Sequence, residues 1–363
     1  MLPVPISNPP NPWSSTEVEY LEEPPPDIRL EVYEDHSREI LAKNDSPDVP
    51  FTYSVNPYRG CFHGCAYCYA RPSHEYLSFG AGTDFERRIV VKPNAAALLD
   101  RALRRKSWRK EAIAFSGVTD CYQPLEASYR LTRACLEVCL AHGNPVGVIT
   151  KAPLIERDAD LLVALAEKAD VHVTISIPFW DKEQARAIEP YVATPERRLR
   201  IVETLAARGL SVGVNVAPII PGLNDQDIPR ILSAARDAGA TSAGYVLLRL
   251  PGSVEQVFSG RLRANLPLSA DRILHRIRET RGGQMYNPRF GIRGRGEGPY
   301  AQTIEALFEA TAARLGLRAR GFMTEDAAPA SETATAATAP QASLPAAAPK
   351  EDKPSGQLTL FGW

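Results

Sequence analysis

Residues 51–71 read FTYSVNPYRGCFHGCAYCYAR and place a strand-like run beside three closely spaced cysteines. The run 51–55 is rich in β-branched and aromatic residues, which is typical of a β-strand, and the Asn, Pro and Gly after it end the strand. The cysteines at positions 61, 65 and 68 therefore follow the carboxyl end of a strand. In parallel α/β folds, ligands bind at that edge of the sheet.

Five more strand-like runs follow, and helical patterns separate them. The predicted strands are 112–116, 146–150, 171–177, 212–218 and 243–249, and the predicted helices are 94–106, 125–141, 157–169, 195–208 and 225–238. Gly143, Gly209 and Gly239 stand where helix C-caps belong. Apolar strands separated by helices indicate a parallel sheet buried on both faces. About six βα units form either an open doubly wound sheet or a partial barrel.

The composition is that of a globular protein without a membrane span. Hydrophobic residues make up 44% of the 363 residues, and no run of about 18 apolar residues occurs. The N-terminus lacks the basic and apolar regions of a secretory signal. Six clustered cysteines in a chain of this size favour metal binding over disulfides. We therefore expect a cytoplasmic protein.

The net charge of −1 conceals a basic body. Residues 1–50 carry eleven acids and three bases, and residues 324–363 carry five acids and two bases, so residues 51–323 have a net charge of +10. Such a body fits an anionic partner such as nucleic acid, although an Arg-rich solvated surface is an equal alternative. Nine arginines gather between positions 261 and 295: Arg261, Arg263, Arg272, Arg276, Arg278, Arg281, Arg289, Arg293 and Arg295.

We predict three parts along the chain. Residues 1–46 are an acidic, Pro-rich extension, expected to be extended or disordered. Residues 47–323 form the α/β body, and its basic C-terminal extension includes two more helices near 268–281 and 299–315 and closes one side. Residues 324–363 are an Ala-, Pro- and Thr-rich linker that cannot bury enough apolar surface to fold. It ends in the apolar peptide QLTLFGW.

The spacing C-x3-C-x2-C of Cys61, Cys65 and Cys68 suits an iron–sulfur cubane held by three thiolates. The fourth iron is then open to a substrate, and the glycines at positions 60 and 64 let the loop wrap closely. A zinc site with His63 as the fourth ligand is the alternative. His63 lies between two of the cysteines, whereas zinc ligand pairs usually come from separate segments.

This spacing, with an aromatic residue before the last cysteine, resembles the signature of the radical S-adenosylmethionine (SAM) superfamily. The resemblance covers roughly residues 51–250. It implies a partial (βα)6 TIM-type barrel with a [4Fe-4S] cluster, on which SAM is cleaved to a 5′-deoxyadenosyl radical. It also implies that Tyr67 packs near the SAM adenine.

The second predicted strand ends in SGVTDCYQPLE, residues 116–126. Radical SAM enzymes place a Gly-rich turn here for the SAM amino group, and Ser116 and Gly117 occupy that turn. The form Thr-Asp-x-Tyr-Gln-Pro-x-Glu resembles the branch related to spore photoproduct lyase, a DNA repair enzyme. A helix N-cap at Thr119 or Asp120 is the plain alternative.

Other strand ends carry further candidates that the resemblance implies for SAM. Lys151 would pair with the SAM carboxylate, and Arg157 is a second candidate for that role. Ser176, which lies on one side of its strand with Thr174, would contact SAM. Asn215 would face the ribose or the sulfonium. The turn at 221–225 after it has an equally good plain interpretation as a turn and helix cap.

The remaining cysteines have different expected roles. Lyase-like enzymes use a cysteine in the loop after the second strand to return a hydrogen atom to the product radical, and Cys121 is the candidate. In the lyase that cysteine precedes the Thr/Ser-Asp pair, where this chain has Gly117, so the lyase reaction is in doubt. Cys135 and Cys139 lie four apart on an apolar helical face and are expected to pack in the core.

We therefore expect a radical SAM enzyme that acts on a nucleic acid lesion or base. Modification of tRNA or of a peptide is the alternative within the superfamily, and a metal-binding protein recruited to DNA without turnover is the alternative outside it. A one-electron reductant such as flavodoxin or ferredoxin would be a partner, and no membrane is expected.

The C-terminal peptide suggests another partner. Gln357, Leu358, Leu360 and Phe361 match the Gln-Leu-x-Leu-Phe peptide by which bacterial repair and replication proteins dock on the sliding clamp. The three apolar side chains would enter a groove, and the glutamine would supply amide hydrogen bonds. The linker before them would act as a tether of roughly 30 Å if flexible. Alternatively, the tail folds back on the body.

Overall fold

The structure is a computed structural model that describes residues 4–6 and 30–319. Its main sheet has eight strands in the order β12-β11-β10-β9-β8-β7-β4-β3. Their bounds are β3 (Leu41–Lys43), β4 (Tyr53–Val55), β7 (Ile113–Phe115), β8 (Val146–Thr150), β9 (Val171–Ser176), β10 (Ser211–Ile219), β11 (Ser242–Leu247) and β12 (Arg318–Ala319). The strands from β4 to β11 run parallel in chain order. This order never reverses, so the prediction of a partial (βα)6 barrel is confirmed over the doubly wound sheet.

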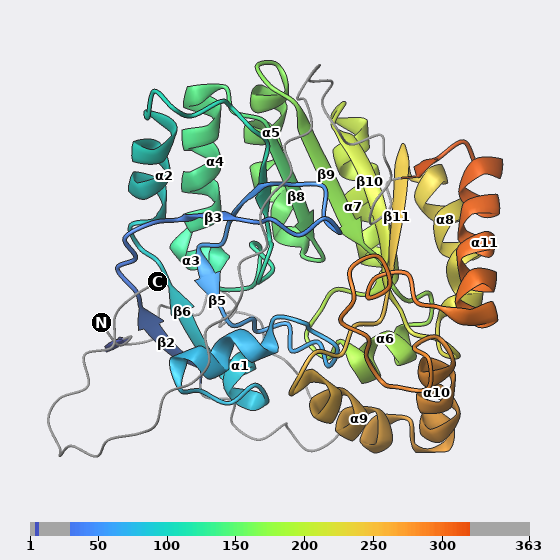
Figure 1. The fold of residues 1–363 in the computed structure, drawn as a ribbon. Helices are drawn as coiled ribbons and strands as arrows, with labels where there is room; N and C mark the ends of the chain where they lie inside the picture. The colour runs from blue at the N-terminus through green and yellow to red at the C-terminus, as the bar shows by residue number, and fades with distance from the viewer. Residues whose placement is uncertain (1–3, 7–29, 320–363) are drawn as a thin grey trace, which may run out of the picture. The chain divides into compact units, whose positions relative to one another are not determined.

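Helices cover one face of this sheet (Figure 1). They are α2 (Ala95–Leu103), α4 (Leu131–His142), α5 (Ala159–Ala166), α7 (Pro195–Ala207), α8 (Ile228–Asp237) and α11 (Gly298–Arg314). Val148, Val173 and Val214 lie in the core on that side and are almost fully buried. Gly143, Gly209 and Gly239 have φ of 56°, 81° and 98°, so they allow the left-handed turns predicted after three of the helices.

The single helix predicted for 125–141 is wrong, because it breaks into α3 (Glu126–Tyr129) and α4. Arg130 takes a left-handed φ of 51° at the break. The break brings the Glu126 carboxylate over the start of α4, where it accepts from Thr132 N at 2.9 Å and Arg133 N at 3.1 Å. A negative side chain at a helix N-terminus satisfies its free amides.

A second sheet was not predicted. It has the order β1-β2-β6-β5, and its strands are β1 (Val4–Ile6), β2 (Glu31–Glu34), β5 (Tyr58–Arg59) and β6 (Arg88–Val91). Between β5 and β6 lie η1 (Arg71–Leu77) and α1 (Thr83–Arg87). β2 pairs with β6, and β3 pairs with β4. The part of the N-terminal extension from residue 31 onward therefore belongs to the folded body and is not a separate disordered segment.

The C-terminal extension closes the open side of the partial barrel, as predicted. The extension begins with α9 (Val254–Asn265) and α10 (Pro267–Glu279), and α9 packs against the earlier helix α6 (Lys182–Ile188). After α10, an irregular segment that we call the strap, residues 281–297, joins the two ends of the sheet. Leu247 N in β11 donates to Gly294 O at 2.8 Å, and Gly291 N donates to Asp48 Oδ1 at 2.8 Å before β4. In Figure 1 the orange strap and the blue β3–β4 connection meet in front of the strands.

Within residues 4–6 and 30–319, no helix is long and apolar enough to cross a membrane. The predicted linker 324–363 and its terminal peptide lie outside the described residues.

Candidate metal and cofactor site

The cysteine-bearing segment, residues 60–70, lies just beyond the carboxyl end of β4 and is called the cluster loop. Cys61, Cys65 and Cys68 are free thiols, and the first two are buried. Two tight turns shape the loop, because Gly64 N donates to Cys61 O and Cys68 N donates to Cys65 O, each at 3.3 Å. All three sulfurs are thus presented by one short segment.

Gln123 holds the start of the cluster loop from the connection after β7. Its side chain is fully buried; Nε2 donates to Gly60 O at 3.1 Å, and Oε1 accepts from Phe62 N at 3.2 Å. Gly60 has a φ of 77°, and a Cβ on it would lie 2.8 Å from His74 Cε1, so only glycine fits there. A buried amide satisfied on both sides fixes the backbone between these contacts.

Arg71 holds the rest of the loop and is itself fully buried. Its guanidinium donates to Gly64 O at 3.0 Å and to Cys65 O at 2.7 Å, and it pairs with Glu86 at 2.6 Å. Further bonds reach the carbonyls of Ala81 and Gly82. Arg261 from α9 also donates to Gly64 O and pairs with Glu86. Two arginines and one carboxylate therefore lock the middle of the loop.

The Thr-Asp-x-Tyr-Gln-Pro-x-Glu motif supports the cluster loop. Thr119 Oγ1 donates to Tyr58 O at 2.8 Å, just before the loop. Asp120 accepts from Thr150 Oγ1 at 2.6 Å and from Lys151 N at 2.9 Å, at the end of β8. The alternative that Thr119 or Asp120 caps a helix is wrong, because neither α3 nor α4 has a side-chain cap at its N-cap residue.

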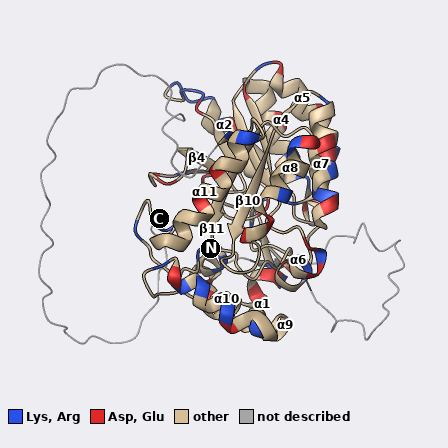
Figure 2. Cartoon of the chain, turned by 90° about the vertical axis from the view of Figure 1, so that its right-hand side faces the viewer, with Lys and Arg blue, Asp and Glu red and all other residues tan. Residues whose placement is uncertain are grey.

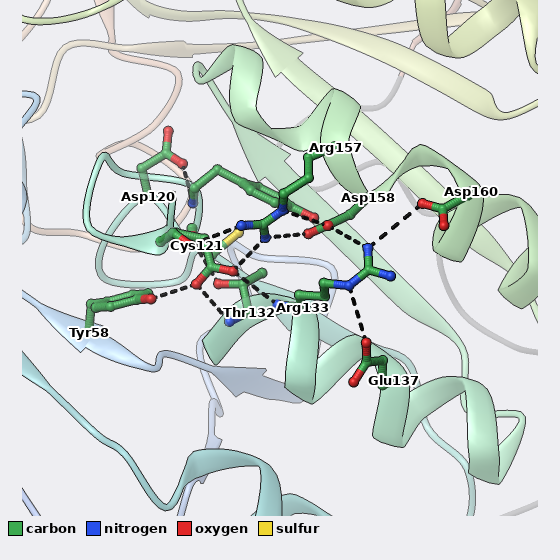
Figure 3. Close-up of polar contacts among 11 residues, drawn as sticks. Tyr58, Asp120, Cys121, Thr132, Arg133, Glu137, Arg157, Asp158 and Asp160 are labelled. Carbon is green, nitrogen blue, oxygen red and sulfur yellow. Dashed lines mark hydrogen bonds and ion pairs between the residues drawn. The ribbon is translucent and has the colours of Figure 1, made fainter. Parts of the chain in front are cut away.

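Glu126, the last residue of the motif, joins several elements, and Figure 3 labels its partners Tyr58, Thr132 and Arg157. It is fully buried, accepts from Tyr58 OH at 2.5 Å and pairs with Arg157 at 2.8 Å. Arg157 also pairs with Asp158 at 2.7 Å, and Arg133 reaches the same carboxylate at 2.8 Å. The prediction of Arg157 as a ligand of the SAM carboxylate is therefore wrong, since its guanidinium is engaged by these two buried carboxylates.

A buried polar cluster lies behind Tyr67 and was not predicted from the sequence. Tyr67 OH donates to Glu189, which pairs with Arg198. Both charged side chains are at most 2% exposed. Arg198 also donates to Ser176 O at 3.1 Å. The cluster thus links the cluster loop to the end of β9 through residues after α6 and in α7, far apart in sequence and without a local motif.

Lys151 lies next to this cluster. Its Nζ stands 5.8 Å from the centre of the Tyr67 ring. Burial alone lowers the pKa of Lys151, but Cys65, Glu189 and Asp120 outweigh it and hold the pKa above its usual value. The structure therefore brings two predicted cofactor residues together and keeps a positive charge beside the cluster loop.

In the turn after β7, the Ser116 hydroxyl and the Gly117 carbonyl already accept hydrogen bonds from other residues of the protein. Ser116 has a left-handed φ of 82°, and its hydroxyl accepts from Cys121 N at 2.8 Å. Gly117 O accepts from Tyr69 OH at 2.7 Å, and a Cβ on Gly117 would lie 3.2 Å from Ser54 Oγ. The turn therefore packs tightly against Ser54, and the predicted contact of Ser116 and Gly117 with SAM stays a prediction.

Ser176 and Asn215 lie side by side in register on β9 and β10. Neighbouring residues in register point to the same side of a sheet, and Thr174 shares that side because it lies two residues before Ser176. Val173 and Val214 point the other way, into the helix-covered core. These predicted residues therefore face the inner side of the partial barrel.

The cysteines outside the cluster loop are core residues. Cys135 and Cys139 are fully buried in α4, as predicted. Cys121 is 1% exposed and belongs to the same core cluster. As a hydrogen donor, Cys121 would therefore act from a packed position, and its role stays a prediction.

The donor set fits an iron–sulfur cluster. Burial raises the pKa of Cys61 and Cys68, and raises that of Cys65 to about 12, so these thiols hold their protons until a metal replaces them. No three His, Cys, Asp or Glu side chains in the described ranges converge on one ion, but a cubane carries each thiolate on a different iron. His63, the fourth ligand of the zinc alternative, lies with Nδ1 3.5 Å from Asp120 Oδ2.

Only part of the basic segment is available to an anionic partner. Arg261, Arg281 and Arg293 are engaged inside the protein with Glu86, with the carbonyls of Leu248 and Ile292, and with Asp48. Figure 2 shows positive and negative positions interspersed around α9 and α10. The arginines classed as exposed are Arg263, Arg272, Arg276, Arg278 and Arg289. Arg261, Arg281 and Arg293 are therefore taken up by the protein itself, and nucleic acid binding by the exposed arginines stays a prediction.

Comparisons with known proteins agree with this geometry. Residues 55–235 match the Radical SAM superfamily. An uncharacterized protein of Mycobacterium tuberculosis is 42% identical over 228 residues, which are 61% of this chain and 67% of the relative. An uncharacterized protein of Methanocaldococcus jannaschii is 30% identical over 173 residues, 48% of this chain and 62% of the relative.

Solved structures of spore photoproduct lyase share the fold. Its complex with dinucleoside spore photoproduct gives a TM-score of 0.55 at 16% identity, covering 80% of this chain and 82% of that chain. A variant with bound AdoMet and the same dinucleoside gives 0.58 at 15% identity, covering 80% and 81%. At this identity the likeness concerns the fold. With three free cysteines on a loop at the carboxyl edge of six parallel strands, the chain belongs to the radical SAM superfamily of enzymes.

Proposed function

We propose that the protein binds a [4Fe-4S] cluster through Cys61, Cys65 and Cys68 and acts on a lesion or base in nucleic acid. The cluster loop carries the first part of this proposal, because a buried network holds its three free thiols at the edge of the sheet where ligands bind. When bound, the cluster and SAM together supply a 5′-deoxyadenosyl radical that abstracts hydrogen from the substrate.

The residues around the cluster loop would position SAM. Lys151, beside Tyr67, would pair with its carboxylate, and Tyr67 would pack against the adenine. The carbonyl of Gly117 would accept from its amino group. Ser176 and Asn215 would face its ribose side on the inner wall of the barrel. The strap covers this wall and would keep bulk water from a reactive radical.

Three observations support nucleic acid as the substrate. The body has a net charge of +10, and the strap leaves an arginine and an aromatic side chain exposed. The solved lyase with the same fold binds a dinucleoside lesion. The position of Cys121 differs from the lyase pattern, so the reaction on this substrate need not be the lyase reaction.

Anaerobic reconstitution with iron and sulfide tests the cluster. We expect a brown protein with about four irons per chain, and Cys61→Ala, Cys65→Ala or Cys68→Ala should each abolish it. Cys135→Ala and Cys139→Ala are matched controls that should keep the iron. One tightly bound zinc and no iron would contradict the proposal.

SAM cleavage with dithionite then tests the substrate. Formation of 5′-deoxyadenosine and methionine would separate an enzyme from a scaffold protein. We expect UV-damaged DNA to accelerate this cleavage or to be altered in it. Stimulation by tRNA or by a peptide instead would replace DNA as the substrate.

We further propose that the tail recruits the enzyme to DNA. Residues 324–356 would tether Gln357, Leu358, Leu360 and Phe361 to a bacterial sliding clamp, which raises the local concentration on DNA. The peptide 354–363 should bind the clamp with micromolar affinity, and a Leu360→Ala, Phe361→Ala double variant should lose it. If only the free peptide binds and the intact protein does not, the tail folds back; if neither binds, clamp docking is refuted. A flavodoxin or ferredoxin would supply the electron.

A further inference from the structure

Phe290 lies on the strap with 59% of its surface exposed. A single exposed apolar side chain needs no explanation by itself. Phe290 differs because its ring is held: the guanidinium carbon of Arg293 lies 4.4 Å from the ring centre. One face of the ring is therefore covered by a cation, and the remaining surface is presented to solvent.

The cation is itself fixed from the opposite side of the barrel. Arg293 pairs with Asp48, which is fully buried, and donates to Ser46 Oγ. The same carboxylate accepts from Gly291 N at 2.8 Å. Asp48, Arg293 and Phe290 thus form a chain of contacts in which each residue restrains the next.

The backbone around Phe290 is also ordered. Arg293 N donates to Arg289 O at 2.9 Å, which closes a turn over Phe290. Gly291 has a φ of 79°, which side-chain-bearing residues rarely adopt, and it follows the aromatic residue directly. The ring is thus pre-organised, so binding against it costs little ordering entropy.

The charge around the ring indicates the partner. The strap carries four arginines and a single acid, Glu297. Arg289 directly precedes the ring, and its side chain is exposed. An aromatic face beside arginines binds an unstacked base and its phosphate, as in proteins that bind single strands.

We propose that Phe290 stacks against an unstacked base of a nucleic acid strand while Arg289 contacts the neighbouring phosphate. This inference rests on the proposed function, because it assumes a nucleic acid substrate. The strap crosses the front of the inner wall (Figure 1). The stacked base therefore belongs to the strand that delivers the reacting base to that wall.

The test is fluorescence anisotropy with the reconstituted full chain and a labelled single-stranded thymine oligonucleotide at low salt. Phe290→Ala should weaken binding about ten-fold, the effect of removing one base–aromatic stack. Phe290→Tyr should bind like the natural protein. Tyr76→Ala removes an aromatic side chain that is 88% exposed elsewhere and should leave the affinity unchanged.

The outcomes separate this inference from the proposed function. If the natural protein does not bind the oligonucleotide at all, a nucleic acid substrate is refuted and the stacking site with it. If the natural protein binds and Phe290→Ala binds equally well, only the stacking site is refuted. Should Phe290→Ala lose its iron or its folded state, Phe290→Leu decides, because leucine preserves the apolar bulk without an aromatic face. Undiminished binding by Phe290→Leu would overturn the proposal.

Discussion

The cluster loop and the strap are both irregular segments held by a buried arginine, yet they differ in what else holds them and in what they leave exposed. The cluster loop is fixed from beneath by buried side chains, with Arg71 and Gln123 fully buried against its carbonyls and amides. The strap is fixed by its own turns, by its buried Arg281, and by ion pairs of Arg293 with Asp48 and of Arg295 with Glu305. It nevertheless leaves Phe290 exposed.

The roles proposed for the two segments account for the difference. A loop that places three thiols around a cluster cannot shift without losing a ligand, so its backbone is satisfied by the interior at many points. A segment that receives a substrate needs an exposed surface, and a few restraints at its base suffice. Substitutions in the two segments should therefore have effects of different size and kind.

The largest effect is expected for Arg71→Met. The substitution removes the guanidinium bonds of Arg71 to Gly64 O and Cys65 O, and Glu86 keeps Arg261 alone as its charged partner. We therefore expect a loss of about 3–5 kcal/mol in the free energy of unfolding. The denaturant concentration at the midpoint of unfolding and the iron content after reconstitution should both fall. Arg272→Met, which removes an exposed guanidinium with one bond to Gly222 O, is the control. Equal stability of the two variants would show that the buried arginine does not hold the loop.

How far the sequence leads can be seen in the same loop. The C-x3-C-x2-C spacing and the glycines are local signals, so the cluster loop and its place after a strand were predictable. The parallel strands were also predictable, because each is an apolar run bounded by glycines and polar residues. The α3–α4 break was not, since the propensity of 125–141 is helical throughout and the break serves the Glu126 carboxylate.

The side-chain pairs that support the cluster loop and the strap are invisible in the sequence for a physical reason. Tyr67 and Glu189 lie 122 residues apart, Glu86 and Arg261 lie 175 apart, and Asp48 and Arg293 lie 245 apart. Such pairs carry no periodicity, and an arginine that pairs inside the protein has the same letter as one that awaits a phosphate. This is why the sequence does not distinguish Arg261 and Arg293, which pair inside the protein, from the exposed Arg289.

Glu189→Gln should give a pH-dependent loss. Burial opposes ionisation, but Arg198 and Lys151 hold the pKa of Glu189 below its ordinary value of 4.5. A depressed carboxyl pKa contributes stability above the ordinary value, and this contribution is lost as the pH falls through the folded value. At pH 7 the variant leaves Arg198 without its carboxylate, so a loss of about 3 kcal/mol is expected. Urea unfolding from pH 7 downward should show the difference shrinking below pH 4.5; a difference that grows in acid would contradict the pairing.

Gln123→Leu should have a smaller effect. It leaves Gly60 O and Phe62 N without their buried partner, which costs about 2 kcal/mol. Because these atoms flank Cys61, the iron content should fall more than the stability does. Gln256→Leu on α9, whose side chain is exposed, is the matched control. Unchanged iron in Gln123→Leu would show that the loop is held by Arg71 alone.

The smallest effect on stability is expected for Asp48→Asn. The amide can still accept from Gly291 N, and Arg293 is 15% exposed and can be hydrated, so a loss of about 1–2 kcal/mol is expected. The iron content should stay at the natural level, since no contact of Asp48 reaches the cluster loop. Oligonucleotide affinity should nevertheless fall, because Arg293 no longer holds the ring of Phe290. Measured together, the three quantities separate the segments: a loss of iron with little loss of affinity would mean that the strap supports the cluster loop and not the substrate.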